Sequence, residues 1–352
     1  MKKLMFFVTS LKTGGSEKAC VRTANALVPF FDVTVCTLFG GGALQKELSP
    51  QVNVKSVFPR FIRGAAHIAS YIPPEICHKL FIGGGYDIET AVGDGLESHI
   101  VSGSKNKNKY SWIHMDVRFH GNDKSKKTDK RFASFKRIIC VSETAKRGFI
   151  SKFGFGGKLA VAYTPVDADE IISKSNEKSD VSCPFDGDFY ISVGRLEDVK
   201  GFDRLIEAVA ANDGVRLVIV GDGTRRKALA ERIERLGAGE RIFLAGNSEN
   251  PYPLMKRAKA YICSSLNESF GFAPVEAMAL GIPVISTRCG GVEEILNSDN
   301  SGILCDNSVD GLRKAIADFE SGKLKTDKAA AETRARDFSP EKCLKKFIET
   351  VE

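Results

Sequence analysis

The strongest constraint on the fold is an alternation of strand-like and helix-like segments that runs twice along the chain. In the first series, buried or β-rich runs occupy residues 4–10, 32–38, 86–92, 110–116, 137–142 and 159–167, and helical spacing occurs at 16–30 and 143–154. Strands that alternate with helices predict a parallel sheet covered on both faces.

The second series is close to a strict alternation. Its strands are expected at 189–194, 215–221, 241–246, 260–265 and 283–287, with helices at 202–210, 225–237, 252–258 and 274–281. A polar stretch with two prolines separates the two series and is typical of a linker. The predicted fold class is therefore α/β, with two Rossmann-like doubly wound domains facing a cleft. The predicted parts are an N-terminal domain (1–165), a linker (166–187), a C-terminal domain (188–337) and a final segment (338–352).

Length and composition agree with two soluble domains. The chain has 352 residues, of which 43% are hydrophobic and 27% charged, which is typical of globular proteins. No apolar run approaches the length of a membrane-spanning helix. The N-terminal sequence MKKLMFFVTSL resembles a short signal peptide, but no small-residue cleavage site follows it. We expect a buried first strand and a cytoplasmic protein.

The cysteines and the charged residues further limit the kinds of site and partner that we expect. Nine cysteines are scattered singly without a CxxC pair, which argues against a zinc site and a disulfide scaffold and favours reduced core thiols. The formal charge is +7, and residues 104–109 and 124–137 carry much of the excess. Such basic segments suit an anionic membrane surface, nucleic acid or anionic substrates, or form a solvated face. No nucleic-acid module accompanies them, so nucleic acid is not expected.

The segment SLNESFGFAPVEAMALGIPVIS (265–286) is the first candidate site. A strand ends before it, and Pro274 fits the first position of the helix that follows. Free backbone N–H groups at a helix N-terminus favour an anion such as a diphosphate. Gly271 allows a ligand to approach the backbone closely.

Two glutamates, Glu268 and Glu276, bracket this turn. Ionised carboxylates accept hydrogen bonds from hydroxyls, so one would hold a sugar and the other a ribose. Taken singly, each has a plainer explanation: Glu276 stands where an N3 capping glutamate would stand, and for Glu268 the alternative is a solvated loop charge. The expected Ser or Thr cap is absent, because Ala273 occupies that position. The pair around one turn favours binding.

The segment SVGRLEDVKGFDRLIEA (192–208) is the second candidate site. A strand ends at Gly194 and a helix begins soon after Lys200. A lysine beside a helix N-terminus faces an unfavourable dipole, which a bound anion would reverse. Arg195 is suited to hold a phosphate bidentately, and Lys200 supplies a point charge. Two ordinary surface bases are the alternative.

The first half offers weaker signals. In TSLKTGGSEKA (9–19), Gly14 and Gly15 would clear space for a ligand, and Ser16 would cap the following helix. His114 stands near the end of a strand, where a core histidine is the commoner meaning. The two GDG triplets do not extend to G-x-G-x-x-G, so a dinucleotide site is poorly supported.

With these residues assembled, the chain resembles the family 4 retaining glycosyltransferases of the GT-B fold, many of which build bacterial surface polysaccharides. The most specific motif is the E-x7-E segment Glu268–Glu276 in ESFGFAPVEAMALGIPVISTRCGGVEEIL. GRLEDVKGFDRLIEA, TGGSEKA, WIHMD, CVSETAK and VGDG follow the same pattern. One departure is YTPVD, in which Thr164 replaces the usual asparagine of the domain junction.

The resemblance implies roles for these residues. Arg195 and Lys200 would hold the diphosphate of a nucleotide-sugar, Glu276 the ribose and Glu268 the transferred sugar, and His114 would lie near the reacting carbon. The implied catalytic residues are therefore His114, Glu268, Arg195 and Lys200. The implied substrate-binding residues are Gly14, Gly15, Gly194, Arg195, Lys200, Glu268, Phe270, Gly271, Phe272, Ala273 and Glu276.

The resemblance also implies partners. The donor would be a nucleotide-sugar, with UDP favoured by family habit, and the acceptor a saccharide or polyprenyl-linked saccharide entering from the first domain. Two basic side chains would stabilise the leaving diphosphate, so no metal or other cofactor is expected. Residues 338–352 would pack back on the first domain. The basic segment 124–137 would hold the enzyme on anionic lipid at the inner face of the cell membrane.

Two other functions fit the same donor groups. A GT-B sugar-nucleotide epimerase would need no acceptor, and a nucleotide-binding scaffold would bind the donor without turnover. An NAD enzyme fits less well because the glycine fingerprint is missing.

Overall fold

The computed structural model describes residues 1–352 except 13, 116–130, 155–156 and 297–299. The chain divides into two compact units. Unit 1 comprises Met1–Pro165 together with Pro340–Glu352, and unit 2 comprises Val166–Ser339. Each unit contains one sheet, and every strand pairing in both sheets is parallel.

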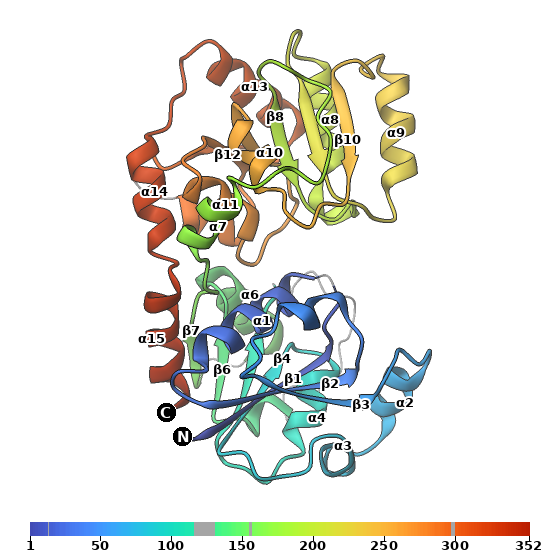
Figure 1. The fold of residues 1–352 in the computed structure, drawn as a ribbon, viewed down its shortest axis with the longest axis vertical. Coiled ribbons are helices and arrows are strands. Elements are labelled where there is room, and N and C mark those ends of the chain that lie inside the picture. The colour runs from blue at the N-terminus through green and yellow to red at the C-terminus, as the bar shows by residue number, and fades with distance from the viewer. Residues whose placement is uncertain (13, 116–130, 155–156, 297–299) are drawn as a thin grey trace. The chain divides into compact units, whose positions relative to one another are not determined.

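Unit 1 contains a seven-stranded sheet with the order β3-β2-β1-β4-β5-β6-β7 (Figure 1). The strands are β1 (Lys3–Ser10), β2 (Asp32–Phe39), β3 (Asn53–Phe58), β4 (Ile88–Val92), β5 (Lys109–Ile113), β6 (Arg137–Cys140) and β7 (Leu159–Val161). The strand β3 was not predicted, because this edge strand has no buried residue and therefore no run of apolar side chains.

The helices of unit 1 cover both faces of that sheet. They are α1 (Gly15–Leu27), η1 (Ala43–Glu47), α2 (Ala65–Tyr71), α3 (Pro74–Phe81), α4 (Leu96–Ser102), α6 (Glu143–Phe153) and α15 (Pro340–Val351). The last of these belongs to unit 1 because its ring Phe347 lies 5.9 Å from Phe6 and 5.3 Å from Trp112. The Tyr110 hydroxyl also donates a hydrogen bond to the carbonyl of Val351, at 2.8 Å.

Unit 2 contains a six-stranded sheet with the order β10-β9-β8-β11-β12-β13 (Figure 1). The strands are β8 (Tyr190–Val193), β9 (Leu217–Val220), β10 (Ile242–Gly246), β11 (Ala260–Cys263), β12 (Val284–Thr287) and β13 (Ile303–Cys305). The helices are α7 (Ala168–Lys174), η3 (Asp198–Lys200), α8 (Phe202–Ala210), α9 (Arg226–Arg235), α10 (Tyr252–Arg257), α11 (Phe272–Ala279), α12 (Gly291–Leu296), α13 (Val309–Glu320) and α14 (Lys328–Arg336).

Residues 166–187, which the sequence analysis treats as a linker, lie in unit 2 and include the helix α7. Asp167 caps this helix, since its carboxylate accepts a hydrogen bond from the Glu170 N–H at 3.0 Å. Ile171 is buried and anchors the helix to the unit. The polar composition of this stretch therefore concealed a capped helix, in which Ala168 and Ile171 are the buried residues.

Both units have the predicted α/β class with a parallel Rossmann-like sheet, so that prediction is confirmed. All nine cysteines are free thiols, and seven of them are buried. Among the described residues, no helix combines the length and the hydrophobicity needed to cross a membrane.

Candidate functional site

The candidate residues of unit 2 lie near the carboxyl ends of its strands, either on the loops that leave the strands or in the first turns of α11. Backbone hydrogen bonds join these loops to one another. The N–H of Leu196, after β8, donates to the carbonyl of Asp222, after β9, at 2.9 Å, and the N–H of Leu266, after β11, donates to the carbonyl of Val199 at 2.8 Å. Ligands bind at this edge in open parallel sheets.

Glycines allow three of these loops to approach one another closely. Gly201 has a φ of +60°, and a Cβ there would lie 2.4 Å from the carbonyl oxygen of Ser264. A Cβ on Gly221 would lie 1.9 Å from the carbonyl oxygen of Gly194. Side chains at these two positions would push the loops apart, so the glycines fix the shape of the site.

Lys200 and Glu268 form a salt bridge between two of the loops, through Lys200 Nζ and Glu268 Oε1. The Ser265 hydroxyl donates to the same carboxylate oxygen at 2.7 Å. Burial by itself lowers the pKa of Lys200, but the charge and hydrogen bond of Glu268 outweigh it, and the pKa lies above its usual 10.5. Lys200 is therefore a fixed positive charge.

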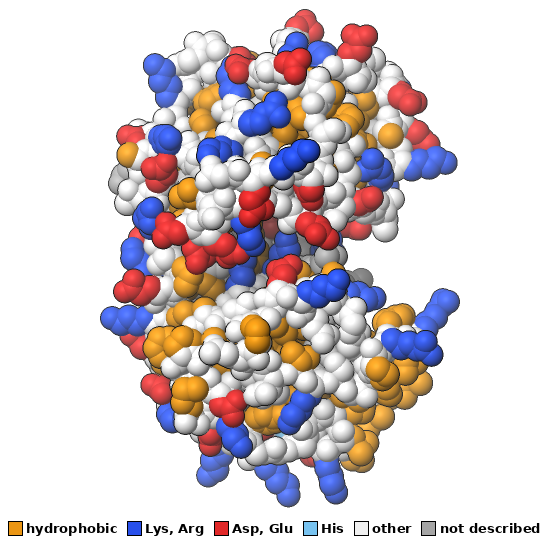
Figure 2. Space-filling model, viewed as in Figure 1, with side chains coloured by type: hydrophobic (Ala, Val, Ile, Leu, Met, Phe, Trp, Pro, Cys, Tyr) orange, Lys and Arg blue, Asp and Glu red, His pale blue; other side chains and the backbone are white. Residues whose placement is uncertain are grey.

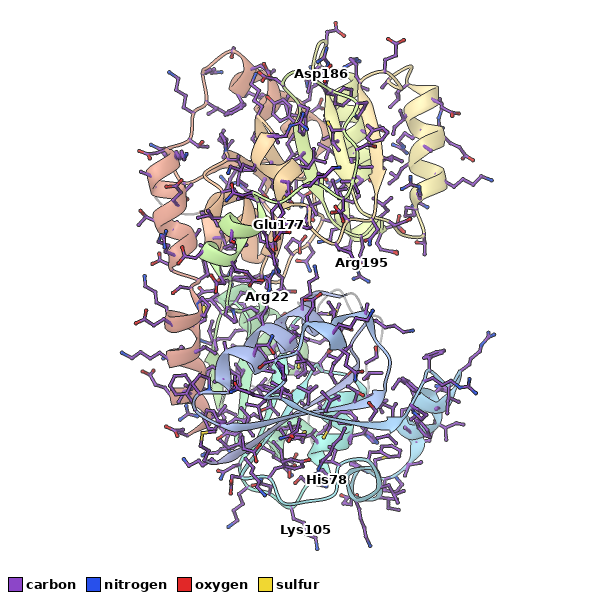
Figure 3. The ribbon with its side chains drawn as sticks, in the orientation of Figure 1. Arg22, His78, Lys105, Glu177, Asp186 and Arg195 are labelled. Atoms are coloured by element: carbon purple, nitrogen blue, oxygen red, sulfur yellow. The ribbon has the colours of Figure 1, made fainter. Side chains whose placement is uncertain are left out.

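Arg195 adds a second positive charge to the same loop. Its side chain is exposed at the end of the unit 2 sheet where β8 stops (Figure 3). No residue in the described part of the chain pairs with its guanidinium. Its charge lowers the pKa of Lys200, although less than burial does, and the two residues lie on the same loop. Two adjacent cations of this kind suit a ligand with several negative charges, such as a diphosphate.

The turn into α11 departs in one respect from the prediction. Gly271 is the N-cap with a φ of +102°, and the helix begins at Phe272, so Pro274 is its third residue and not its first. Glu276 is the fifth helical residue, so the N3 capping role considered for it is wrong.

Glu276 is buried, and the Tyr252 hydroxyl donates a hydrogen bond to its Oε1 at 3.0 Å. A buried carboxylate needs such donors because the charge has lost its water. Tyr252 lies in α10 and was missed by the sequence analysis, since nothing in PYPLMKR indicates which side chain it meets. Ser265 was not predicted either, although a serine at the end of a strand and three residues before Glu268 could have been named as a candidate binding residue.

Three aromatic and small residues of the turn have different environments. Phe270 is buried, and its ring packs edge-on against Phe272 at 5.4 Å and Phe338 at 5.4 Å. Only the backbone of Phe270 therefore remains for a ligand. Phe272 and Ala273 are half-buried at the start of the helix.

The glycine pair of unit 1 stands at the start of α1. Gly14 is the N-cap with an extended backbone, and a Cβ on Gly15 would meet nothing within 4 Å. The open space beside Gly15 is what a closely approaching ligand requires. Ser16 does not cap the helix as predicted; its hydroxyl donates to Glu17 at 2.8 Å instead.

His114 follows directly after β5 in unit 1. Its ring lies 4.2 Å from that of Trp112. Burial lowers its pKa to about 3, so the imidazole is neutral at physiological pH. Its buried Nε2 has no hydrogen-bond partner among the described residues. A neutral imidazole with one unused nitrogen is suited to a ligand hydroxyl.

Unit 1 also contains a half-buried carboxyl that was not predicted as a site residue from the sequence. Glu97, in α4, accepts hydrogen bonds from the backbone N–H of Thr9, at 3.2 Å, and from the Thr9 hydroxyl. Burial, more than any other influence, raises its pKa above the usual value, although the Thr9 hydrogen bonds oppose this. Glu97 lies beside the carboxyl ends of β1 and β4.

Of the two basic segments predicted as a binding surface, only some of the side chains are exposed in the described part of the chain. Residues 124–130 lie outside the described part of the chain, and so does Asp116. Within 104–109, Lys109 is buried and donates to the carbonyls of Ser102 and Ser104, at 2.8 and 2.5 Å. Arg131 donates to the carbonyl of Asp94 at 2.7 Å. These two bases hold their own unit together, whereas Lys105 and Lys107 are exposed.

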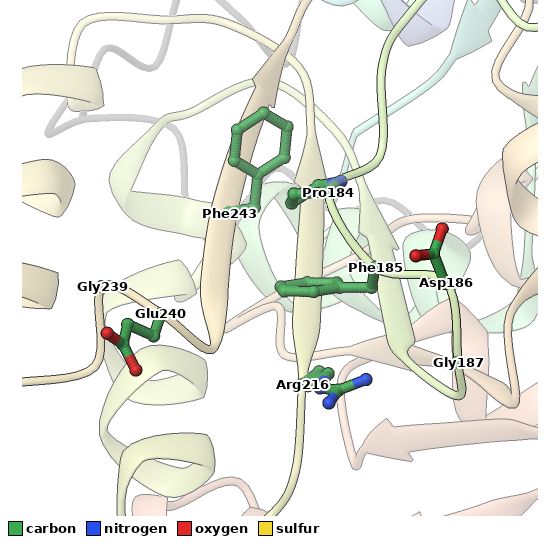
Figure 4. A pocket seen from close by; sticks show the side chains of 8 residues that line it. All are labelled: Pro184, Phe185, Asp186, Gly187, Arg216, Gly239, Glu240 and Phe243. Carbon is green, nitrogen blue, oxygen red and sulfur yellow. The ribbon is translucent and has the colours of Figure 1, made fainter.

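A cavity of about 570 Å³ lies at the opposite edge of the unit 2 sheet. Figure 4 shows its lining, which comes from the segments that precede β8, β9 and β10, including Phe185, Arg216 and Glu240, and from Phe243 within β10. The Arg216 guanidinium lies 5.7 Å from the ring of Phe185. None of the candidate residues contributes to this cavity.

A known protein family matches most of unit 2. Residues 174–336 match the family model described as "Glycosyl transferases group 1". That range contains every candidate residue of unit 2, including Lys200, Glu268 and Glu276. The salt bridge and the buried glutamate thus lie inside the part of the chain that is similar to glycosyltransferases.

Curated relatives carry names of the same kind. The chain is 30% identical over 168 residues to a lipopolysaccharide core biosynthesis glycosyltransferase, LpsE, of Rhizobium meliloti, covering 47% of this chain and 49% of the relative. It is 30% identical over 188 residues to the N-acetylgalactosamine-N,N'-diacetylbacillosaminyl-diphospho-undecaprenol 4-alpha-N-acetylgalactosaminyltransferase of Campylobacter jejuni, covering 51% and 50%. The matches span about half the length of these relatives.

Solved structures extend the likeness of fold to the whole chain. The Anabaena protein HepE, solved in complex with UDP and glucose, superimposes with a TM-score of 0.78 at 22% identity, covering 100% of this chain and 99% of HepE. At this identity the likeness concerns the fold.

Proposed function

We propose that this protein is a glycosyltransferase that moves a hexose or N-acetylhexosamine from a nucleotide-sugar to an acceptor. The observation that carries the proposal is the Lys200–Glu268 salt bridge beside Arg195, on loops at the carboxyl edge of the unit 2 sheet. It lies within residues 174–336, which match group 1 glycosyl transferases.

The chemistry of transfer accounts for the two cations. Breaking a sugar–phosphate bond builds negative charge on the departing diphosphate and positive charge on the sugar ring. Arg195 and Lys200 are suited to stabilise the first of these charges, because they supply it with fixed positive groups. We accordingly propose a reaction that requires no metal ion, with Glu268 held in place by Lys200 next to the transferred sugar.

In this proposal, the remaining candidate residues contact different parts of the donor. Glu276, oriented by Tyr252, accepts hydrogen bonds from the ribose hydroxyls. Gly194 and the backbone of 270–273 line the diphosphate and the sugar. In unit 1, the open space beside Gly15 accommodates the diphosphate and neutral His114 contacts the donor sugar, whereas the Glu17 carboxylate fills the space beside Gly14.

The finer assignment is membership of family 4, with retention of configuration and UDP as the nucleotide. It rests on the E-x7-E motif and on HepE, which was solved with UDP and glucose. The proposed acceptor is a saccharide or a lipid-linked saccharide of surface polysaccharide or lipopolysaccharide synthesis. Relatives with lipopolysaccharide core and diphospho-undecaprenol in their names support it. The proposed location is the cytoplasm, at the inner face of the cell membrane.

A thermal-shift panel with UDP, GDP, ADP and their common sugars tests the donor site. We expect one nucleotide series to stabilise the wild type, because a ligand that binds only the folded state raises its stability. The Glu276→Ala variant should lose that shift. The absence of a shift with every nucleotide would refute the donor site.

Turnover assays separate the proposed transfer from its alternatives. Nucleoside diphosphate release that depends on an added saccharide acceptor, and that persists with EDTA, is the expected result. Conversion of the donor sugar without any acceptor would identify an epimerase. Donor binding without turnover on a broad acceptor panel would identify a binding scaffold.

A further inference from the structure

The short hairpin formed by α2 and α3 in unit 1 exposes a concentration of large hydrophobic side chains. Between residues 61 and 80, six such side chains are between 45% and 76% exposed: Phe61, Ile62, Ile68, Tyr71, Ile76 and Leu80. They account for six of the fourteen exposed large hydrophobic residues described in the whole chain. Exposed apolar side chains scattered singly are ordinary, but a contiguous group marks an interaction surface.

Four of the six residues lie on the two helices, and Phe61 and Ile62 lie in the segment that precedes α2. Ile68 and Tyr71 are three residues apart in α2, and Ile76 and Leu80 are four apart in α3, so each pair shares one face. In Figure 2, hydrophobic side chains gather over α2 and α3, with lysine and arginine side chains at the margin. We call this group, residues 61–80, the apolar hairpin face.

The opposite side of the hairpin is firmly attached to unit 1. His78 Nε2, in α3, lies 2.9 Å from Glu89 Oε2 in β4, and both side chains are buried. His99 Nε2, in α4, lies 2.9 Å from the carbonyl oxygen of Ile72, between the two helices. The hairpin therefore presents its apolar face from a fixed position.

Charge indicates what covers this face. Arg60, Arg63 and Lys79 are exposed in or beside the hairpin, against one acidic residue, Glu75. Lys12 joins them, since its Nζ lies 4.4 Å from the centre of the Phe61 ring. Apolar and aromatic side chains with a basic margin match the boundary of a bilayer, where acyl chains lie below anionic headgroups.

We propose that the apolar hairpin face docks unit 1 on an anionic lipid bilayer. The hydrophobic side chains would enter the boundary between headgroups and acyl chains, and the basic margin would pair with headgroup phosphates. This inference rests on the proposed function, because a lipid-linked acceptor is reached at such a surface. It assigns the membrane contact to described residues of α2 and α3, in addition to the segment 124–137.

Vesicle co-sedimentation of the full chain tests the proposal, using phosphatidylcholine vesicles with about 30% phosphatidylglycerol. The wild type should sediment with these vesicles and only weakly with phosphatidylcholine alone. The double variant Ile68→Gln/Leu80→Gln should bind at least about tenfold more weakly, since two inserted apolar groups are lost. Arg60→Gln/Arg63→Gln should weaken binding and reduce its dependence on salt.

The matched control is Phe30→Gln/Leu236→Gln, which changes two exposed hydrophobic residues outside the hairpin. It should bind vesicles as the wild type does. Wild-type protein that stays in the supernatant, or an Ile68→Gln/Leu80→Gln variant that binds normally, would overturn the proposal. A wild-type dimer that this variant converts to a monomer, without vesicle binding, would overturn it in favour of an interface between two copies.

The nucleotide thermal shift separates this inference from the proposed function. The Ile68→Gln/Leu80→Gln variant should retain the wild-type shift, which also shows that it is folded. Vesicle binding without any nucleotide shift would leave the docking surface supported and the donor site refuted. A nucleotide shift without vesicle binding would refute the docking surface alone.

Discussion

Lys200 and Glu268 lie 68 residues apart in the sequence, yet their side chains form one salt bridge between the loops after β8 and β11. Both side chains are mostly removed from water, with 24% and 17% exposed. The bridge holds a positive charge and a carboxylate side by side at the edge of the unit 2 sheet. We expect the pairing of the two charges to contribute to stability, and the positive charge of Lys200 to contribute to sugar transfer.

A double-mutant cycle on this pair separates the two contributions. Lys200→Met leaves the Glu268 carboxylate without its charged partner, so it should lower the free energy of unfolding by about 1–2 kcal/mol. Lys200→Met/Glu268→Gln should recover part of that loss in urea titrations. Transfer should fall by about 100-fold or more in both variants, because the charge that stabilises the leaving group is gone. Activity that returned with stability would contradict the assigned role of Lys200.

The same pair predicts a simple pH dependence of stability. The folded state raises the pKa of Lys200 above its usual 10.5. The stabilisation is therefore fully present below the unfolded value and is lost as the pH rises through the folded value. Wild type and Lys200→Met should differ in unfolding free energy by a constant amount across neutral pH and converge in alkali. A difference that vanished near neutrality would contradict this sign.

The glycine between these loops offers a matched pair of substitutions. Gly201 and Gly237 have φ values of +60° and +62°, but only a Cβ at Gly201 would meet another atom, the Ser264 oxygen at 2.4 Å. Gly237→Ala should cost about 1–2 kcal/mol, for the left-handed backbone alone. Gly201→Ala should cost more in the same urea titration, and it should also weaken the nucleotide thermal shift. Equal costs at the two positions would show that the loops separate freely.

Two tyrosines test how Glu276 is held. Tyr252 and Tyr190 each donate a hydroxyl hydrogen bond to a glutamate in unit 2, Tyr252 to Glu276 and Tyr190 to Glu320. Replacement by phenylalanine should cost each about 1 kcal/mol of stability. Only Tyr252→Phe should raise the KM for the donor, by several-fold, because Glu320 lies at the end of α13 away from the site. A similar KM in both variants would remove Tyr252 from the positioning of Glu276.

The sequence predicts the repeating parts of this molecule better than the contacts between them. Strand and helix patterns indicate both sheets, and strand ends indicate Lys200 and Glu268 as neighbours of one ligand. They do not indicate that Tyr252 meets Glu276, since that depends on how α10 packs against the rest of unit 2. The edge strand β3 and the capped helix α7 escaped for a related reason: each has few buried side chains, so hydrophobic periodicity is weak there.

The pKa of His114 predicts how the stability of the protein changes at acidic pH. Burial lowers its pKa to about 3 from the ordinary 6.5. Between these values the unfolded chain binds a proton that the folded chain does not, so the free energy of unfolding should fall as the pH drops below 6.5. The contribution is at most about 1.4 kcal/mol per pH unit. His114→Gln should remove this contribution. In urea titrations between pH 7 and pH 5, the free energy of unfolding of this variant should therefore change less with pH than that of the wild type.

The imidazole should also remain neutral throughout this range, which NMR titration of its ring protons measures directly. An unchanged slope together with a ring that protonates near pH 6.5 would show that His114 is hydrated, and its proposed contact with the donor sugar would then lose its support.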